Sequence, residues 1–126
     1  MAKDQEEWFR QADYDIETAE TLLNGGRYIY AVFMCHLCIE KALKGHYYKK
    51  FKKQAPKTHN LIFFIEAANL EIPKELSKFI VALNRENIVT RYPEDIRRMS
   101  KDYDEKTSGE MIAKSKEALE WLREKL

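Results

Sequence analysis

Apolar residues recur at steps of three and four along most of the chain, which is the period of one face of an α-helix. The first such segment runs from about Gln5 to Leu23 and stops at Asn24-Gly25-Gly26, because glycine readily takes the left-handed conformation of a helix end. The pattern predicts an all-α, up-and-down bundle of four to five helices and no sheet. The further predicted helices are Tyr28–Lys49, Leu61–Asn69, one that opens at Pro73 and closes before Pro93, and a last one from Thr107 or Ser108 onward.

Capping residues and prolines mark the expected ends of these helices. Thr58 or Asn60 is expected to cap the third helix. Pro73 suits the first position of the fourth, where a missing N–H costs nothing. Thr107-x-x-Glu110 matches a capping box at the start of the last helix. The polar stretch 91–106 between them is long for a loop and is expected to hold a short helical turn near Asp95–Met99.

The segment Tyr28–Lys49 is apolar on nearly every side of its helical wheel. Its polar residues His36, Glu40 and Lys44 form one narrow line at four-residue spacing. A helix of this kind is usually buried on several sides. In so small a chain, part of that burial is expected to come from a second subunit, so we predict a homodimer.

Length and composition indicate one globular domain over residues 1–126. Hydrophobic residues make up 44% and charged residues 34%, which excludes a disordered chain. The first seven residues contain no apolar signal region, and no apolar run is long enough to span a bilayer. We therefore expect no membrane association and a cytoplasmic location. The net charge of +1 excludes a general attraction to nucleic acid, so any basic surface must be local.

Cysteine, histidine and aspartate positions offer little catalytic or metal chemistry. Cys35-x-x-Cys38 lies in the middle of a predicted helix among apolar residues, which favours two small core residues over a redox or zinc site. The histidines form no pair with metal-ligand spacing. Asp13 and Asp15 project in different directions and are expected on a solvated face. The sequence predicts no cofactor and no metal site.

Basic residues gather in two places. Lysines surround the end of the second helix and alternate with Tyr47, Tyr48 and Phe51, a pattern suited to single-stranded nucleic acid or, alternatively, to a helix C-terminus that favours cations. Arg85 and Arg91 bracket the end of the fourth helix beside Tyr92. These arginines are suited to binding phosphate or carboxylate, and the alternative is ion pairing with Glu86, Glu94 and Asp95.

Four short segments follow one another along the chain: Gly26-x-Tyr28, Glu40-Lys41-Ala42-Leu43-Lys44, Thr58-His59-Asn60-Leu61 and Arg91-Tyr92-Pro93. In this order they resemble the HEPN domain family, named for higher eukaryotes and prokaryotes nucleotide-binding. The resemblance covers nearly the whole chain. It implies a bundle of four or five helices that pairs as a two-fold dimer. It also implies a minimal nucleotidyltransferase as partner, in two-component systems often of toxin–antitoxin type.

Many members of the family are metal-independent endoribonucleases with an Arg-x(4–6)-His motif. Here Arg85 occupies the position of the arginine, but Thr90, Arg91 and Tyr92 stand where the histidine is expected. An imidazole is the usual proton carrier at neutral pH, so its absence argues against carrying the nuclease activity over.

We therefore expect a non-catalytic module that binds the phosphate of a nucleotide or RNA, a nucleotidyltransferase, or both. One alternative is a divergent endoribonuclease that uses Arg85, Arg91 and His59. Another is a purely structural dimeric partner. The candidate ligand-binding residues are Arg85, Arg91 and Tyr92, followed by Lys41, Lys44, Glu40 and His59.

Overall fold

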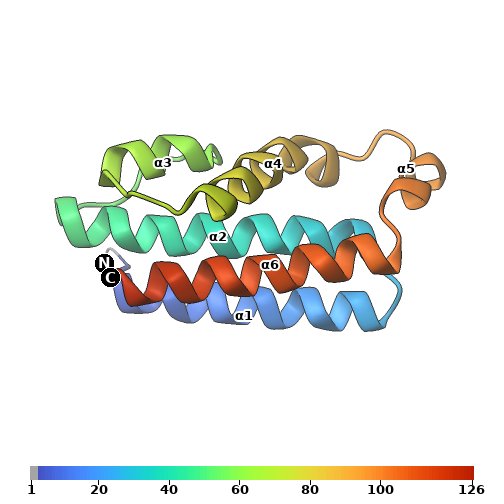
Figure 1. Ribbon diagram of the computed structural model, residues 1–126, viewed down its shortest axis with the longest axis horizontal. Helices are drawn as coiled ribbons and strands as arrows, with labels where there is room; N and C mark the ends of the chain where they lie inside the picture. Colours follow the sequence, from blue (N-terminus) through green and yellow to red (C-terminus); the bar gives the residue numbers. More distant parts are fainter. Residues whose placement is uncertain (1–2) are drawn as a thin grey trace.

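The computed structural model describes residues 3–126, and within them all regular structure is helical (Figure 1). Four long helices build the body and two short ones complete it, which confirms the predicted all-α class. The long helices are α1 (Gln5–Asn24), α2 (Tyr28–Phe51), α4 (Lys74–Arg91) and α6 (Glu105–Glu124), and the short ones are α3 (Leu61–Ala68) and α5 (Ile96–Asp102).

Most helix ends follow the capping chemistry of the sequence. The first helix ends as predicted, and Gly26 has the left-handed φ of +76° in the turn that follows. Of the two predicted caps for α3, Asn60 caps it, and its side chain accepts a hydrogen bond from the Ile62 N–H at 3.1 Å. The predicted turn near Asp95–Met99 is the full helix α5, capped by Asp95.

Two predicted helix starts are wrong by one to three residues. Pro73 is the N-cap of α4, with ψ of 144°, and the helix begins at Lys74. The last helix begins at Glu105, because Asp104 is its cap and accepts from the Thr107 N–H at 2.8 Å. A carboxylate in this position satisfies a free N–H of the first turn, and the capping box at Thr107 is not used.

The central helix α2 contacts every other helix of the chain. Its apolar sides pack against α1 and α6 below it and against α3 and α4 above it in Figure 1. None of its residues from 31 to 48 is fully exposed, and twelve of its 24 are buried. The same chain therefore supplies most of the predicted burial, and the burial of α2 does not by itself argue for a second subunit. The homodimer itself remains a prediction.

Cys35 and Cys38 are fully buried in the core that α2 shares with α1 and α6. Burial raises the pKa of the Cys35 thiol to about 11 and also raises that of Cys38. Both thiols are protonated at neutral pH, as expected of core residues.

Among residues 3–126, no helix combines the length and the hydrophobicity needed to cross a lipid bilayer.

Candidate functional site

A polar network lies between α2 and the segment that leads into α3. The predicted line of His36, Glu40 and Lys44 faces this segment rather than solvent, and Glu40 is its centre. One oxygen of the buried Glu40 carboxylate is 2.9 Å from Nδ1 of His59, and the other is 3.0 Å from Nζ of Lys44. Two of the predicted site residues, His59 and Lys44, thus contact a third, Glu40. The ammonium group of Lys44 already balances the negative charge of the Glu40 carboxylate.

His36 is fully buried one helical turn before Glu40. Its Nδ1 is 3.7 Å from the Glu40 carboxylate, which is too far for a hydrogen bond. Desolvation lowers the pKa of His36 to about 4, although Glu40 acts in the opposite direction and Arg91 adds to the lowering. The imidazole is therefore neutral at pH 7, and a cationic neighbour is tolerated beside it.

Arg91, at the end of α4, is held in place by neutral groups. Its Nε donates a hydrogen bond of 3.2 Å to Oδ1 of Asn87, one turn earlier, and its guanidinium carbon lies 4.6 Å from the centre of the Phe33 ring. The Nη2 atom is buried without a hydrogen-bond partner. Within residues 3–126, no carboxylate lies within ion-pair distance of Arg91. The result is an oriented guanidinium with an uncompensated charge.

Arg85 lies on a different face of α4. It is exposed and lines a shallow hollow together with Lys74 and Lys78. Like Arg91, it forms no ion pair among the residues that the structure describes. The expected alternative for both arginines, pairing with nearby carboxylates, is therefore not observed. Glu86 instead accepts a hydrogen bond from the Tyr103 hydroxyl, and Asp95 caps α5.

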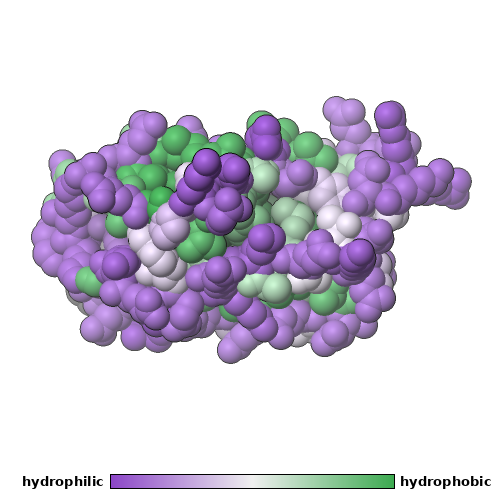
Figure 2. All heavy atoms as spheres, in the orientation of Figure 1, coloured by the Kyte–Doolittle hydropathy of each residue, from purple (hydrophilic) through white to green (hydrophobic). Residues whose placement is uncertain are grey.

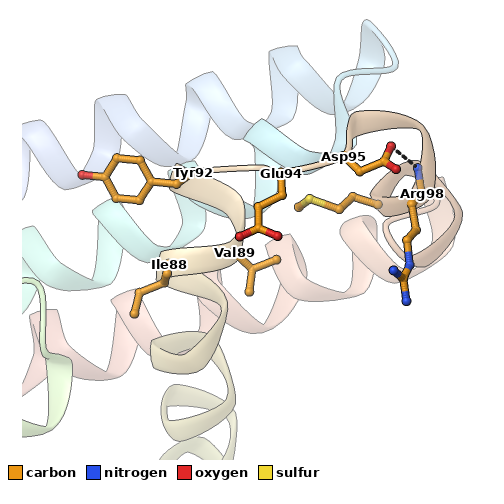
Figure 3. Close-up of a pocket in the computed structure, with 7 residues that line it drawn as sticks. Ile88, Val89, Tyr92, Glu94, Asp95 and Arg98 are labelled. Atoms are coloured by element: carbon orange, nitrogen blue, oxygen red, sulfur yellow. Dashed lines mark hydrogen bonds between the residues drawn. The ribbon is translucent and has the colours of Figure 1, made fainter.

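Tyr92 is largely exposed beside a pocket of about 350 Å³ between the end of α4 and α5 (Figure 3). Ile88 and Val89 form part of its wall, and Glu94 projects toward Val89. Asp95 and Arg98 also line the pocket. The pocket thus holds two carboxylates, Glu94 and Asp95, against one cation, Arg98, and Arg91 is not among its lining residues. Tyr92 and Arg91 therefore do not line the same pocket within one chain.

Lys41, the residue after Glu40 on α2, is directed toward α1. Its Nζ is 2.9 Å from Oδ2 of Asp15, and Asp15 is buried. The expectation of a solvated Asp15 is wrong, because the carboxylate packs between the two helices. Burial raises the pKa of Asp15, and the ion pair with Lys41 opposes that rise. Lys41 therefore stabilises the α1–α2 contact.

Two site residues, Phe33 and Asn87, were not found from the sequence. Asn87 precedes Arg91 by four residues on the same helix, so its spacing was a usable signal. Phe33 belongs to another helix, and no sequence pattern indicated that its ring would lie under Arg91.

No hydrogen bond joins a histidine to Arg85 or Arg91 within the described part of one chain. His59 is bound to Glu40, and His46 contacts the Leu122 carbonyl at 2.7 Å. Within residues 3–126 of a single chain, the ribonuclease alternative therefore has no hydrogen-bonded Arg–His pair.

Comparison with known proteins agrees with this architecture. Over 97% of its length, the chain superposes on 98% of TT1696 from Thermus thermophilus, with a TM-score of 0.82 and 22% identity. ST0689, an archaeal HEPN homologue, matches with a TM-score of 0.76 and 24% identity over 98% of both chains. These likenesses establish the fold. No curated protein matches the chain significantly. The family model described as HEPN domain matches residues 5–125, which is nearly the whole chain, and the protein therefore belongs to the HEPN domain family.

Proposed function

We propose that this protein is a non-catalytic HEPN module that binds the phosphate group of a nucleotide or RNA at Arg91. The observation that carries the proposal is the guanidinium of Arg91, which Asn87 and Phe33 orient while no carboxylate neutralises it. A phosphate offers two oxygens to the planar fork of an arginine, so this geometry favours it as the missing partner.

The titratable groups near Arg91 do not neutralise its positive charge, which leaves that charge available to an anion. His36 is near enough for Arg91 to lower its pKa, and burial keeps it neutral at pH 7. The Nδ1 of the half-exposed His59 is engaged with Glu40. We place Lys41 and Lys44 outside the ligand site, because each already pairs with a carboxylate. Arg85 lies on another face, so it can reach the same ligand only from a second subunit.

The test is titration of ATP by calorimetry with wild-type protein and the variants Arg91→Lys and Arg97→Lys. Lysine keeps the charge but loses the bidentate fork, so Arg91→Lys should weaken binding by about tenfold or more. Arg97, which is exposed on α5, is the matched control and should bind like wild type. Equal affinity of wild type and Arg91→Lys would remove Arg91 from the site.

A partner interface is the second part of the proposal. Within residues 3–126, five of the nine exposed large hydrophobic side chains lie between residues 81 and 96, on α4, at its C-cap and at the start of α5. They are Val81, Ile88, Val89, Tyr92 and Ile96. Figure 2 shows hydrophobic side chains reaching the surface over α3 and α4, whereas hydrophilic ones cover most of the lower edge. Such a patch is typical of a protein interface.

We infer that this α4 surface is where a second copy or a minimal nucleotidyltransferase docks. The toxin–antitoxin setting implied by the family stays a prediction. Co-expression with a minimal nucleotidyltransferase, followed by size-exclusion chromatography, tests the docking role. A stable complex supports it, and separate elution argues against it.

A further inference from the structure

Unneutralised lysines collect at the end of the molecule where α2 finishes. Residues 41–65 contain seven lysines and no Asp or Glu, in a chain whose net charge is only +1. Lys41 and Lys44 have carboxylate partners. The other five are exposed and belong to no ion pair within residues 3–126, although one of them, Lys49, donates a hydrogen bond to the main-chain oxygen of Leu126. These five are Lys49, Lys50, Lys52, Lys53 and Lys57. Residues 41–65 thus carry a local excess of positive charge where α2 finishes, at the left edge of Figure 2, which hydrophilic side chains cover.

A series of four aromatic rings crosses from α2 to α3 beside these lysines. The centroid of Phe51 is 4.6 Å from that of Tyr47, Tyr47 is 6.0 Å from Phe64, and Phe64 is 5.2 Å from Phe63. The inner ring of Phe64 is buried, whereas the outer rings of Phe51 and Phe63 are 37% and 39% exposed. The outer rings are therefore fixed by the inner ones and face solvent as preformed surfaces.

The cations are placed close to these rings. Nζ of Lys50 lies 5.5 Å from the centre of Phe51 and donates a hydrogen bond to the Ala67 carbonyl of α3. Nζ of Lys52 lies 5.9 Å from the centre of Tyr48. Lys53 and Lys57, in the loop that follows, form no side-chain hydrogen bond or ion pair within residues 3–126 and are accessible to a ligand.

We propose that this lysine–aromatic end, defined by Phe51, Phe63, Lys50, Lys52, Lys53 and Lys57, binds single-stranded nucleic acid without reading its sequence. Lysines neutralise the backbone phosphates and exposed rings stack on unpaired bases, which is how sequence-independent single-strand binding works. A duplex carries the same phosphate charge, but its bases are paired and stacked. It would therefore contact the lysines of this surface and not the aromatic rings.

The surface is independent of the Arg91 site. Arg91 packs on Phe33, which precedes Phe51 by 18 residues on α2. At 1.5 Å per residue, that spacing corresponds to about 27 Å along the helix axis. The two sites lie toward opposite ends of α2, and either can fail while the other stands.

The experiment measures binding of the full chain to a fluorescein-labelled 12-nucleotide oligouridylate by fluorescence anisotropy over a series of salt concentrations. Two double variants lose the same charge: Lys53→Gln with Lys57→Gln in the proposed surface, and Lys106→Gln with Lys114→Gln on α6 as the control. At low salt, the first pair should weaken binding by about tenfold or more and reduce the slope of log K against log salt by about 1.4, at 0.7 per lost phosphate contact. The control pair should stay within about twofold of wild type.

The aromatic part is tested with Phe63→Ala and Phe63→Tyr. Loss of the ring should weaken binding by about fivefold or more at an unchanged salt slope, and tyrosine should restore it. The lysine variants keep the test valid if Phe63→Ala does not fold.

Three results would overturn the proposal. They are equal weakening by both lysine pairs, equally tight binding of a 12-base-pair duplex, and preferential binding to vesicles rich in phosphatidylserine. If instead Arg91→Ala abolishes oligonucleotide binding while the lysine pair has no effect, the strand occupies the Arg91 site and the lysine–aromatic end is excluded.

Discussion

At the scale of single residues, His36 links the burial of one side chain to the stability of the whole fold. Its pKa is about 4 in the folded chain because of burial, compared with 6.5 for an exposed histidine. Between these values the unfolded chain binds the extra proton, so stability falls as the pH drops through this window. We expect the free energy of unfolding to decrease by about 2 kcal/mol between pH 7 and pH 5 through His36.

Urea unfolding at pH 7 and pH 5 measures this effect, with His36→Gln as the comparison. Burial also lowers the pKa of His46, so the variant should keep a weaker pH dependence of the same sign. An identical pH dependence in wild type and variant would show that His36 is not the responsible group.

Contacts along one helix could be read from the sequence, and contacts between helices could not. The line of His36, Glu40 and Lys44 and the cap Asn60 depend on local spacing, and each lies where the pattern indicates. The pairing of Asp15 with Lys41 joins two helices, so it depends on how they rotate against each other. A single sequence therefore does not distinguish a solvent-exposed aspartate from one that is buried between two helices.

At the scale of helices, the close contact between α1 and α2 depends on the absence of a side chain at Gly45. A Cβ on Gly45 would lie 3.0 Å from the Phe9 ring and 3.4 Å from the Gln5 carbonyl oxygen. Alanine in a helix interior normally stabilises by about 1 kcal/mol relative to glycine. Here overpacking against the buried Phe9 should outweigh that gain, so we expect Gly45→Ala to destabilise the fold by about 1–3 kcal/mol.

Gly109→Ala on α6 is the matched control. Its Cβ would meet only Leu23 Cδ2, at 3.8 Å, which is an ordinary contact. This variant should raise the melting temperature, whereas Gly45→Ala should lower it. A higher melting temperature for both would mean that α1 can move away from α2 at little cost.

The start of α6 shows that capping preferences alone do not fix a helix boundary. Asp104 and Thr107 are both good caps and lie three residues apart, so two starts of α6 were compatible with the sequence. Asp104 caps the observed helix, and its hydrogen bond to Thr107 lowers the pKa of the carboxyl group.

At the scale of the whole molecule, the sequence pattern indicated that α2 is buried but did not indicate which elements bury it. Its apolar surface suggested a second subunit, but five helices of the same chain contact it. Five exposed large hydrophobic side chains lie instead between residues 81 and 96, and this redirects the predicted homodimer to the surface of α4 and the start of α5. Hydrophobic periodicity shows that a helix is buried without showing what buries it.

We expect Ile88→Glu to weaken self-association, because a carboxylate in an apolar interface loses its hydration without gaining a partner. Sedimentation velocity over a range of protein concentrations measures the effect. Tyr14→Glu on α1 is the control, since Tyr14 is 71% exposed and Ile88 is 70% exposed. A wild-type chain that stays monomeric at all concentrations would contradict the homodimer, and equal effects of both variants would contradict its placement.

The start of α1 and the end of α6 pack against two adjacent residues of α2. Gly45 faces Phe9 and Gln5, and the imidazole of the adjacent His46 contacts the Leu122 carbonyl. Figure 1 places this junction at the end of the bundle where α2 finishes. Any purification tag or fused reporter, whichever terminus carries it, therefore projects from the end that bears the lysines. Probes intended to leave that end accessible should be attached at the opposite one, for example in the turn around Gly25 and Gly26.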